Sequence, residues 1–494
     1  MRILKRLSIF LYSIFLLCFF VLSKMPLSAS ASAEQNITDE INEMVQEHMD
    51  KAKITSVSIA FIQNGEATYL SYGENSADKL SLYQIGSTTK AFTALGVLWL
   101  EDEGLLSLDD PVSWYIPWLT IKHDGVDVPI EDFSIANLLY QTSGFTNDEA
   151  RFPSAEDGMT LEDSVRALVN CELAFYPSTQ YAYANANYNV LGLLIEIVSG
   201  QSYQDFMAEK ILSPLGLGNT YSDPAIAEQT GTIVKGSRLA FFQSHPYEIP
   251  VNIASIPAGY ILSDIHDMSR WIQIHMGLIE VTDQFARLVS KAHIPDKSNA
   301  VDADTYYASG WFVQSDGTIY HSGGTPNYSS RVMFNPDDGL GVCVLTNINA
   351  SANTEMIAEN VMAILEGQTP SPYQADIWTI IDTIFSILTF ICTPLLLFTL
   401  FLLIRSVIQV HKGGRAKRKW SKKAVTFVLG SALLVVLSIA IIIILPITFG
   451  SSWQDLVVWA PYSLYTGTSA LTLFSITLFA MVIAKSAGIK VKGK

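Results

Sequence analysis

Hydrophobic and polar positions follow a strand-like pattern near the start of the chain. Two eight-residue runs, SVSIAFIQ (56–63) and EATYLSYG (66–73), are rich in β-branched and aromatic residues, and Asn64-Gly65 joins them. An Asn-Gly pair between two such runs is typical of a tight β-hairpin, because both residues tolerate the positive φ angles of its turn. The pattern therefore predicts two antiparallel strands.

The segment that follows divides into helical and strand-like parts. A helix is predicted over 36–52, and residues 105 to 300 are mostly of helical pattern with loops rich in Pro and Gly. Strand-like runs return after Gly310, and a helix predicted over 354–366 follows them. Hairpins without alternating strand and helix units favour an α+β fold, in which an antiparallel sheet carries a helical subdomain.

Three apolar segments near the C-terminus are each close to the ~20 residues needed to cross a bilayer. They are residues 383–404, 424–448 and 466–484. Residues 405–423 and the tail 485–494 are rich in Lys and Arg, which favours the cytoplasmic side of a membrane. We therefore expect a multi-pass protein of the cell membrane, with a linker (367–382) joining its three-helix transmembrane region to an extracytoplasmic domain (34–366).

The N-terminus has the pattern of an export signal. Basic residues precede the apolar run LSIFLYSIFLLCFFVLS, and Ala31-Ser32-Ala33 fits a signal-peptidase site. We expect residues 1–33 to be a cleaved signal peptide, and an uncleaved membrane anchor is the alternative. Bacterial export is the simplest context for this arrangement.

Charge and cysteine usage narrow the classes of function. Residues 34–376 hold 15 Lys and Arg against 45 Asp and Glu, a balance of −30, whereas the whole chain carries −16. This acidity argues against binding nucleic acid, and it fits either cationic ligands or a solvated acidic surface. Cys171 and Cys343 lie outside the apolar ends, without the spacing of a disulfide framework or metal site. We expect no cofactor and no metal.

The stretch QIGSTTK (84–90) holds the first candidate for catalysis. Ser87 lies three residues before Lys90, and an apolar helix is predicted to follow, so both side chains share one helix face. A serine hydroxyl needs a base to become a nucleophile, and a lysine serves when burial lowers its pKa. At a helix N-terminus, Ser87 also offers its own N–H to an oxyanion. The alternative is that Ser87 only caps the helix.

The stretch YAYANANYNV supplies two further candidates just before a strongly apolar helix. The phenol of Tyr183 near the Ser–Lys pair would relay a proton to a leaving group. The amide of Asn185 would hold a carbonyl group of a substrate. The alternative is that Tyr183 belongs to the hydrophobic core.

The stretch HSGGTPNYSS ends a predicted strand with His321, Ser322, Gly323 and Gly324. Paired glycines in a strand allow a substrate backbone to approach closely, so these four residues are candidates for substrate binding. The N–H of Gly324 would be a second donor to an oxyanion. A plain turn at the end of the strand is the alternative.

In this order and spacing, the three stretches resemble the motifs of the serine β-lactamase and penicillin-binding-protein superfamily. The resemblance is closest to its class C β-lactamase-like branch, the S12 serine peptidases, and covers nearly all of residues 40–366. It implies a sheet covered by helices on both faces plus a helical subdomain. It also implies that Ser87 is the acyl-accepting nucleophile, Lys90 its general base, Tyr183 the proton-relay partner and Asn185 a substrate contact.

One position departs from the pattern of the enzymes that process penicillins. His321 stands where many of them have a lysine, and its neutral side chain lacks the fixed charge that grips a penicillin carboxylate. Domain order and span count also resemble a narrower group, the membrane-anchored peptidases that mature bacterial secondary metabolites, as in the colibactin pathway. Those peptidases remove an N-acyl-D-amino-acid cap from an exported precursor.

Three functions remain open from the sequence. The first is a membrane-anchored peptidase or amidase that cleaves peptides or acyl-peptides containing D-amino acids. The second is a penicillin-binding D,D-carboxypeptidase or weak β-lactamase of the cell wall. The third is a penicillin-recognising sensor or scaffold with little turnover. The sequence does not define the natural substrate or the oligomeric state.

The expected orientation is open to a direct test. A reporter enzyme that is active only in the cytoplasm, fused after Lys494, is expected to be active, because the basic loop and tail keep the C-terminus inside. The same reporter fused after Gln368, in the predicted linker, should be inactive. The reverse pattern of activities would contradict the orientation.

Overall fold

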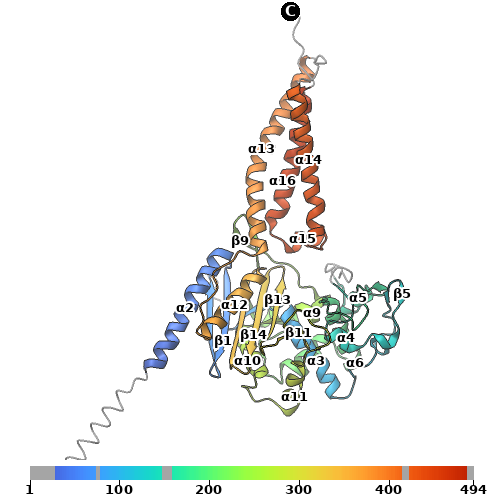
Figure 1. Cartoon of the computed structure of the whole chain (residues 1–494), viewed down its shortest axis with the longest axis vertical. Coiled ribbons are helices and arrows are strands. Elements are labelled where there is room, and N and C mark those ends of the chain that lie inside the picture. Colours follow the sequence, from blue (N-terminus) through green and yellow to red (C-terminus); the bar gives the residue numbers. More distant parts are fainter. Residues whose placement is uncertain (1–27, 74–77, 147–157, 414–421, 487–494) are drawn as a thin grey trace, which may run out of the picture.

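A seven-stranded antiparallel sheet forms the centre of the protein (Figure 1). The computed structural model describes residues 28–73, 78–146, 158–413 and 422–486. The strand order is β11-β12-β13-β14-β15-β1-β2, so strands from both ends of the domain lie side by side. The strands are β1 (Ser56–Gln63), β2 (Glu66–Gly73), β11 (Thr305–Tyr307), β12 (Phe312–Gln314), β13 (Ile319–Thr325), β14 (Tyr328–Asn335) and β15 (Leu340–Thr346).

The first hairpin confirms the prediction made from its turn residues. β1 and β2 occupy the two predicted runs, and Gln63 pairs with Glu66 across the turn. Asn64 and Gly65 have φ angles of 55° and 82°, the left-handed conformation that a two-residue hairpin turn requires. Local turn chemistry therefore defines the register of this pair.

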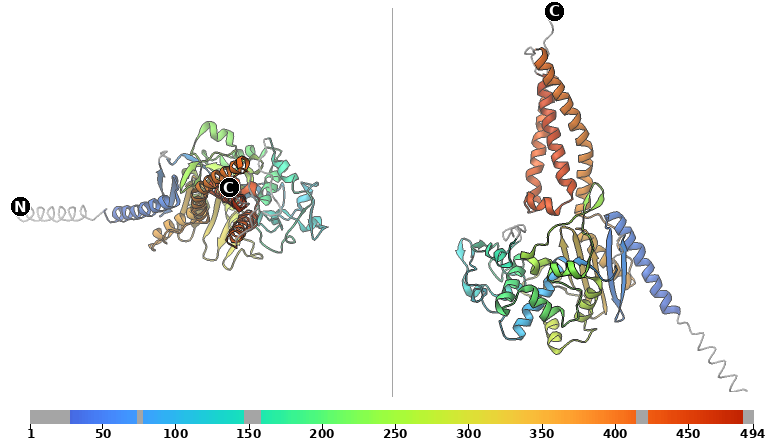
Figure 2. Two further views of the ribbon diagram at one scale, coloured as in Figure 1. Left: turned by 90° about the horizontal axis from the view of Figure 1, so that it is seen from above. Right: turned by 180° about the vertical axis from the view of Figure 1, so that it is seen from behind.

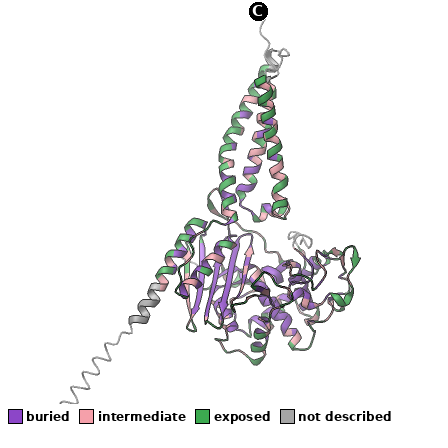
Figure 3. Cartoon of the chain, viewed as in Figure 1, coloured by how far each residue is buried: buried purple, intermediate pink, exposed green. Residues whose placement is uncertain are grey.

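Helices cover both faces of the sheet. Alternate residues of β1 divide between two hydrophobic clusters: Val57 and Ile59 face one, and Ala60 and Ile62 face the other. This alternation follows from the two-residue period of a strand, since both faces of the sheet are buried (Figure 3). The first cluster includes α2 (Ser28–Ala52) and α12 (Ser351–Leu365), and the second includes α3 (Thr89–Asp102), α10 (Ile265–His275) and α11 (Asp283–Ala292).

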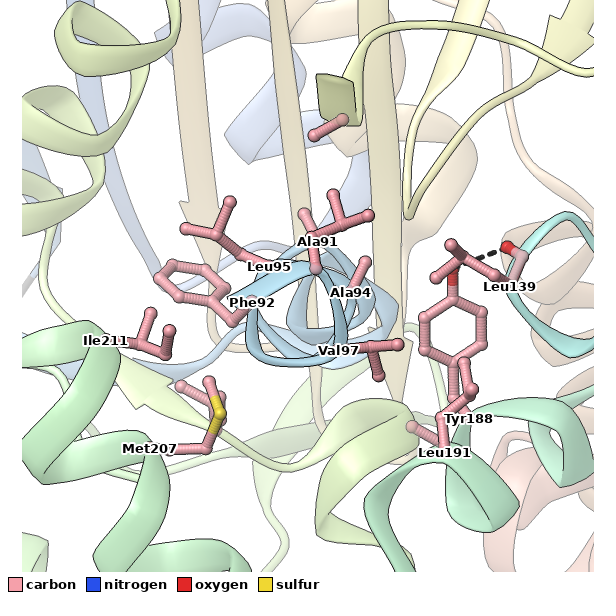
Figure 4. Packing of buried hydrophobic residues seen from close by; sticks show 14 of the residues in the cluster. Ala91, Phe92, Ala94, Leu95, Val97, Leu139, Tyr188, Leu191, Met207 and Ile211 are labelled. Atoms are coloured by element: carbon pink, nitrogen blue, oxygen red, sulfur yellow. Dashed lines mark hydrogen bonds between the residues drawn. The ribbon is translucent and has the colours of Figure 1, made fainter. Parts of the chain in front are cut away.

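The helix α3 is buried on nearly all sides. Phe92 and Leu95 pack within a cluster that includes Met207, and Tyr188 of α6 (Asn185–Ser199) donates a hydrogen bond to the carbonyl of Leu139 (Figure 4). A helix that is apolar all round belongs in a protein interior. Its N-terminal end, which carries the predicted catalytic pair, is thus held on a rigid element.

The remaining short elements form the helical subdomain and its edges, which confirms the predicted α+β fold. The helices are α4 (Ile135–Leu139), α5 (Leu161–Arg166), α6 (Asn185–Ser199), α7 (Tyr203–Phe206), α8 (Pro224–Thr230) and α9 (Ile256–Gly259), with a π-helical turn at Met207–Leu212. The short strands are β3 (Ser81–Gln84), β4 (Ile121–His123), β5 (Val126–Asp127), β6 (Cys171–Glu172), β7 (Thr232–Ile233), β8 (Ser237–Ala240), β9 (Gln243–Pro246) and β10 (Leu262–Ser263).

Three long helices at the C-terminus are apolar enough to cross a membrane, and they stand as a bundle on one end of the domain (Figures 1 and 2). They are α13 (Ile377–Gly413), α14 (Lys422–Thr448) and α16 (Tyr462–Ser486). Each begins before its predicted span, because polar or interfacial residues extend the helix beyond its apolar centre. Helix α13 therefore takes in the end of the predicted linker (367–382) and part of the predicted loop (405–423).

Some sequence predictions lie outside the described residues. These are most of the signal peptide (1–27), the centre of the basic loop (414–421) and most of the C-terminal tail (487–494). A further short helix, α15 (Trp453–Trp459), connects α14 and α16. This helix was not predicted from the sequence.

The β8–β9 hairpin joins the domain to the apolar bundle. The turn residues Phe241 and Phe242 have φ angles of 54° and 68°, a left-handed conformation that is strained for aromatic residues. Both of their backbone N–H groups donate to the buried carboxylate of Asp382 in α13, at 3.0 and 2.7 Å. Both rings also contact Phe390 of α13. The carboxylate therefore stabilises a strained turn and fixes it against the bundle.

Replacing Asp382 by alanine is expected to speed hydrogen exchange at the amides of Phe241 and Phe242 about 10- to 100-fold. The reason is that a hydrogen bond to a charged group contributes ~1.5–3 kcal/mol. Mass spectrometry of peptides covering β8 and β9 measures the rates. Asp376→Ala is the matched control, because Asp376 accepts from the N–H of Thr379 at the start of the same helix. Equal protection in wild type and Asp382→Ala would contradict the role of Asp382.

Candidate active site

The side chain of Lys90 is fully buried and lies beside Ser87. Ser87 lies in a 3₁₀ turn (Gly86–Thr88) that leads directly into α3, and Lys90 is in the first turn of that helix. The Nζ atom of Lys90 is 3.0 Å from Ser87 Oγ, 2.7 Å from Asn185 Oδ1 and 2.6 Å from the carbonyl oxygen of Ala258. The short spacing in sequence thus gives a direct contact between the predicted nucleophile and the predicted base.

The surroundings of Lys90 favour its uncharged form. Burial lowers the pKa of Lys90 well below its ordinary value, because the protein interior solvates an ammonium group poorly. A neutral amine has two N–H donors and one lone pair. Asn185 Oδ1 and the carbonyl oxygen of Ala258 accept the two N–H groups, so the lone pair points to the hydroxyl of Ser87. This arrangement is suited to removing a proton from Ser87.

The phenol of Tyr183 has the complementary property. Burial raises the pKa of Tyr183 well above its ordinary value, and a hydrogen bond with Ser87 offsets part of that shift. The Nζ atom of Lys90 is 4.8 Å from the centre of the Tyr183 ring. A phenol that stays protonated near neutral pH donates a proton rather than abstracting one. Lys90 is therefore suited to be the base, and Tyr183 to pass a proton onward.

Glycines bring β13 against the turn that carries Ser87. Gly86 has a φ angle of 53°, and a Cβ atom there would lie 2.3 Å from the backbone nitrogen of Gly324. A Cβ atom on Gly323 would lie 2.0 Å from the carbonyl oxygen of Ile85. Any larger side chain would push the two backbones apart. This contact places the N–H groups of Ser87 and Gly324 near each other, as an oxyanion site requires.

His321 of β13 is buried, and its ring lies near that of Tyr183. Its ring centroid is 6.2 Å from that of Tyr183. Its Nδ1 lies 2.7 Å from the carbonyl oxygen of Ser322 and its Nε2 3.3 Å from the hydroxyl of Tyr307, so both nitrogens have protein partners. Burial of the imidazole is the largest cause of a lowered pKa, which for His321 is about 3. The imidazole therefore stays neutral and supplies no cation.

The structure does not bring the side chain of Ser322 to the Ser87 cluster. Side chains alternate along β13, so Ser322 points to the opposite face of the sheet from His321. There its hydroxyl accepts a hydrogen bond from Arg331 at 2.7 Å, and Arg331 lies 3.6 Å from Glu359 of α12. The four residues predicted to bind substrate therefore do not act as one unit, because the side chain of Ser322 lies on the opposite face of the sheet from that of His321.

A cavity of about 340 Å³ opens over Ser87. This volume is within the range of small-molecule sites. Asn185 and Gly324 line the cavity together with Ser87, whereas His321, Ser322 and Gly323 are not among its lining residues. The other lining residues are Ile249, Pro250, Asn252, Ser255, Ala258, Gly259, Tyr260, Pro326, Gln454, Asp455, Val458 and Trp459.

Some groups of this site were not predicted from the sequence. Ala258 acts through a main-chain carbonyl, for which its side chain gives no signal. Gln141, by contrast, has a structural role: at a φ angle of 60°, it accepts a hydrogen bond from the N–H of Ala184 and so fixes the segment between Tyr183 and Asn185. The α15 residues come from a segment predicted only to connect two spans. Its Ser452-x-x-Asp455 capping pattern was the available signal for a helix.

Comparison with known proteins identifies the family. A family model described as Beta-lactamase matches residues 41–365. The chain belongs to the beta-lactamase family. Its fold is that of serine β-lactamases and penicillin-binding proteins, as the motifs around Ser87, Tyr183 and His321 implied.

Similar proteins extend across most of the chain. Protein flp of Staphylococcus aureus (strain MRSA252) is 28% identical over 475 residues, which cover 91% of this chain and 91% of that protein. An alignment of that extent reaches into the C-terminal apolar helices. Unguisins hydrolase ungD' of Aspergillus campestris (strain IBT 28561) is 25% identical over 355 residues, covering 66% of this chain and 65% of that protein.

Solved structures show the same fold. The octameric penicillin-binding protein homologue from Pyrococcus abyssi has a TM-score of 0.60 at 24% identity, covering 70% of this chain and 81% of its own. A class C beta-lactamase has a TM-score of 0.58 at 21% identity, covering 66% of this chain and 96% of its own. The domain matched by the family model thus has the fold of class C β-lactamases and penicillin-binding-protein homologues.

Lys90 is expected to control the reactivity of Ser87 with a fluorophosphonate. Labelling should rise with pH and level off below the ordinary lysine pKa of ~10.4, because the neutral amine is the base and burial lowers its pKa. Lys90→Arg and Lys90→Ala should each slow labelling about 10³-fold, since guanidinium does not deprotonate. Ser87→Ala should abolish it.

The matched control is Lys291→Arg, because Lys291 forms an ion pair with Glu101 on the surface and lies outside the cavity. Its labelling rate should equal that of wild type. Substantial labelling of Lys90→Arg would show that Lys90 is not the base.

Proposed function

We propose that this protein is a membrane-anchored extracytoplasmic serine hydrolase, a peptidase or amidase that works through an acyl-Ser87 intermediate. Its substrates are peptides containing D-amino acids or metabolites capped by an N-acyl-D-amino acid. The observation that carries the proposal is the fully buried amine of Lys90 3.0 Å from Ser87 Oγ. Family membership and the fungal relative named as a hydrolase give further support.

The proposed reaction follows from the contacts of Ser87. Lys90 takes the hydroxyl proton while Ser87 Oγ bonds to the carbonyl carbon of the substrate. The N–H groups of Ser87 and Gly324 stabilise the negative charge on the carbonyl oxygen. A proton passes through Tyr183 to the leaving nitrogen, the C–N bond breaks and the amine departs. Water then hydrolyses the acyl ester, which restores the hydroxyl of Ser87 and releases an acid.

The charge of the cavity supports an amide substrate without a carboxylate beside the scissile bond. Among the described residues that line the cavity there is no lysine or arginine. His321, at the position where penicillin-processing relatives have a cation, has a pKa lowered to about 3 and is neutral. A penicillin, or a peptide ending in D-Ala-D-Ala, brings a carboxylate close to the reacting carbonyl. Both would lack a charge-assisted contact here.

Two features support the proposed location. Three C-terminal helices are apolar enough to cross a membrane, and the basic residues of 405–423 favour the cytoplasm for the loop between the first two. Only the first of these spans separates the basic loop from the catalytic domain, so the domain lies on the opposite side of the membrane from the loop. The alignment with the S. aureus relative covers 91% of this chain, so it includes part of the C-terminal apolar helices as well as the beta-lactamase-family domain.

The substrate preference is tested with purified protein in detergent. We expect kcat/KM for an acyl-D-Asn amide to exceed that for nitrocefin and for acyl-D-Ala-D-Ala by about 10- to 100-fold. The reason is that one missing charge-assisted contact costs ~1.5–3 kcal/mol. Ser87→Ala should be inactive on all three substrates.

Two outcomes would contradict the proposal. Efficient turnover of nitrocefin without cleavage of either acyl peptide would favour the penicillin-binding alternative. A stable adduct at Ser87, formed by a β-lactam and not hydrolysed over hours, together with no peptide cleavage, would favour the sensor or scaffold.

A further inference from the structure

One wall of the cavity comes from the apolar bundle rather than from the catalytic domain. Helix α15 lies between α14 and α16, at the end of the bundle nearest the domain (Figure 1). Four of its residues line the cavity that also contains Ser87: Gln454, Asp455, Val458 and Trp459. A connection between two apolar helices thus contributes to the space in which a substrate would react.

The catalytic domain holds α15 in this position through the C-terminal end of the helix. Arg238 donates to the carbonyl oxygen of Val457 at 2.7 Å, Tyr247 to that of Val458 at 3.2 Å, and Asn349 to that of Trp459 at 3.1 Å. The last carbonyl groups of a helix lack partners within it. Side chains from the β8–β9 hairpin region and from the segment after β15 satisfy them, so α15 is bound at a defined place.

The N-terminal end of α15 fixes a carboxylate at the cavity. Asp455 accepts hydrogen bonds from the N–H of Ser452 at 3.1 Å and from its hydroxyl at 2.5 Å, while Ser452 caps the helix in return. These contacts hold the carboxylate in position at the cavity. Asp455 is the one charged residue among the described residues that line the cavity. The field within the cavity is therefore negative on the α15 side.

Apolar side chains of α15 also line the cavity. Val458 lines the cavity beside Trp459, which is 36% exposed. Ile249 and Pro250 line the same cavity from the catalytic domain. Such surfaces bind apolar groups by removing them from water.

We propose that α15 is a specificity-determining wall of the substrate site. Val458 and Trp459 contact an apolar part of the substrate, and Asp455 disfavours a negative charge there. The part of the substrate that faces α15 is then uncharged or cationic. This inference rests on the proposed function and adds to it the chemistry of the substrate on the α15 side.

The test compares two substrates that differ by one charge. Acyl-D-Ala-glycine and acyl-D-Ala-glycinamide have nearly the same shape, but the first ends in a carboxylate. The measured quantity is the ratio of kcat/KM for the acid to kcat/KM for the amide, with the full chain in detergent. Asp455→Asn removes the charge and keeps an oxygen that accepts from Ser452, so helix α15 retains its cap.

Asp455→Asn is expected to raise this ratio about 3- to 30-fold, the effect of one unit charge at roughly 6 Å under partial solvent screening. The rise should shrink as ionic strength increases. Gln454→Glu should lower the ratio. Asp338→Asn is the matched control, because Asp338 is exposed and lies outside the cavity, and it should leave the ratio unchanged.

A second measurement separates this inference from the proposed function. An anionic and a neutral fluorophosphonate of equal length label Ser87 without any need for peptide turnover, and the ratio of their labelling rates should change in the same direction. An unchanged ratio in Asp455→Asn, for peptides or for probes, would overturn the role of α15. Normal labelling without cleavage of either peptide would instead count against the proposed function, and the probe ratio would still decide on α15.

Discussion

The contact between the buried amine of Lys90 and the hydroxyl of Ser87 is the constraint on which the site depends. An ammonium group in this position would lose its hydration, so burial favours the neutral amine. The neutral amine needs two acceptors for its N–H groups, and Asn185 and Ala258 provide them from two different helices. Helices α3, α6 and α9 must therefore meet at one point, and the core around α3 holds them there.

The same low polarity sets the protonation of the neighbouring groups. It raises the pKa of the Tyr183 phenol and lowers that of the His321 imidazole. Lys90, Tyr183 and His321 are thus all favoured in their uncharged forms near neutral pH, although they are of three different chemical types. Proton transfer between uncharged groups does not require an ion pair to be broken first.

Much of this arrangement could be predicted from the sequence, where short-range rules apply. The β1–β2 hairpin follows from Asn64-Gly65, and the contact of Ser87 with Lys90 follows from their spacing on one helical turn. The carbonyl of Ala258 could not be predicted, because any residue has one. Ser322 was grouped with His321 although neighbouring residues of a strand face opposite sides; the two-residue period would have separated them.

The position of helix α15 could not be predicted from the sequence for a different reason. It depends on partners more than 100 residues away in sequence, such as Asn349. No local pattern carries such information. Capping by Ser452 predicts a short helix, but only the folded chain shows that this helix lies over Ser87.

The docking of α15 has a consequence for work with fragments of the protein. A soluble fragment that ends before α13 would keep Ser87, Lys90 and Tyr183 but lose one side of the cavity. Bulk water would enter from that side, and Arg238, Tyr247 and Asn349 would lose the carbonyl groups they bind. Such a fragment reports on the chemistry of the nucleophile. Because α15 lines the cavity of the whole chain, inhibitors chosen against the fragment would be fitted to a surface that the intact protein does not present.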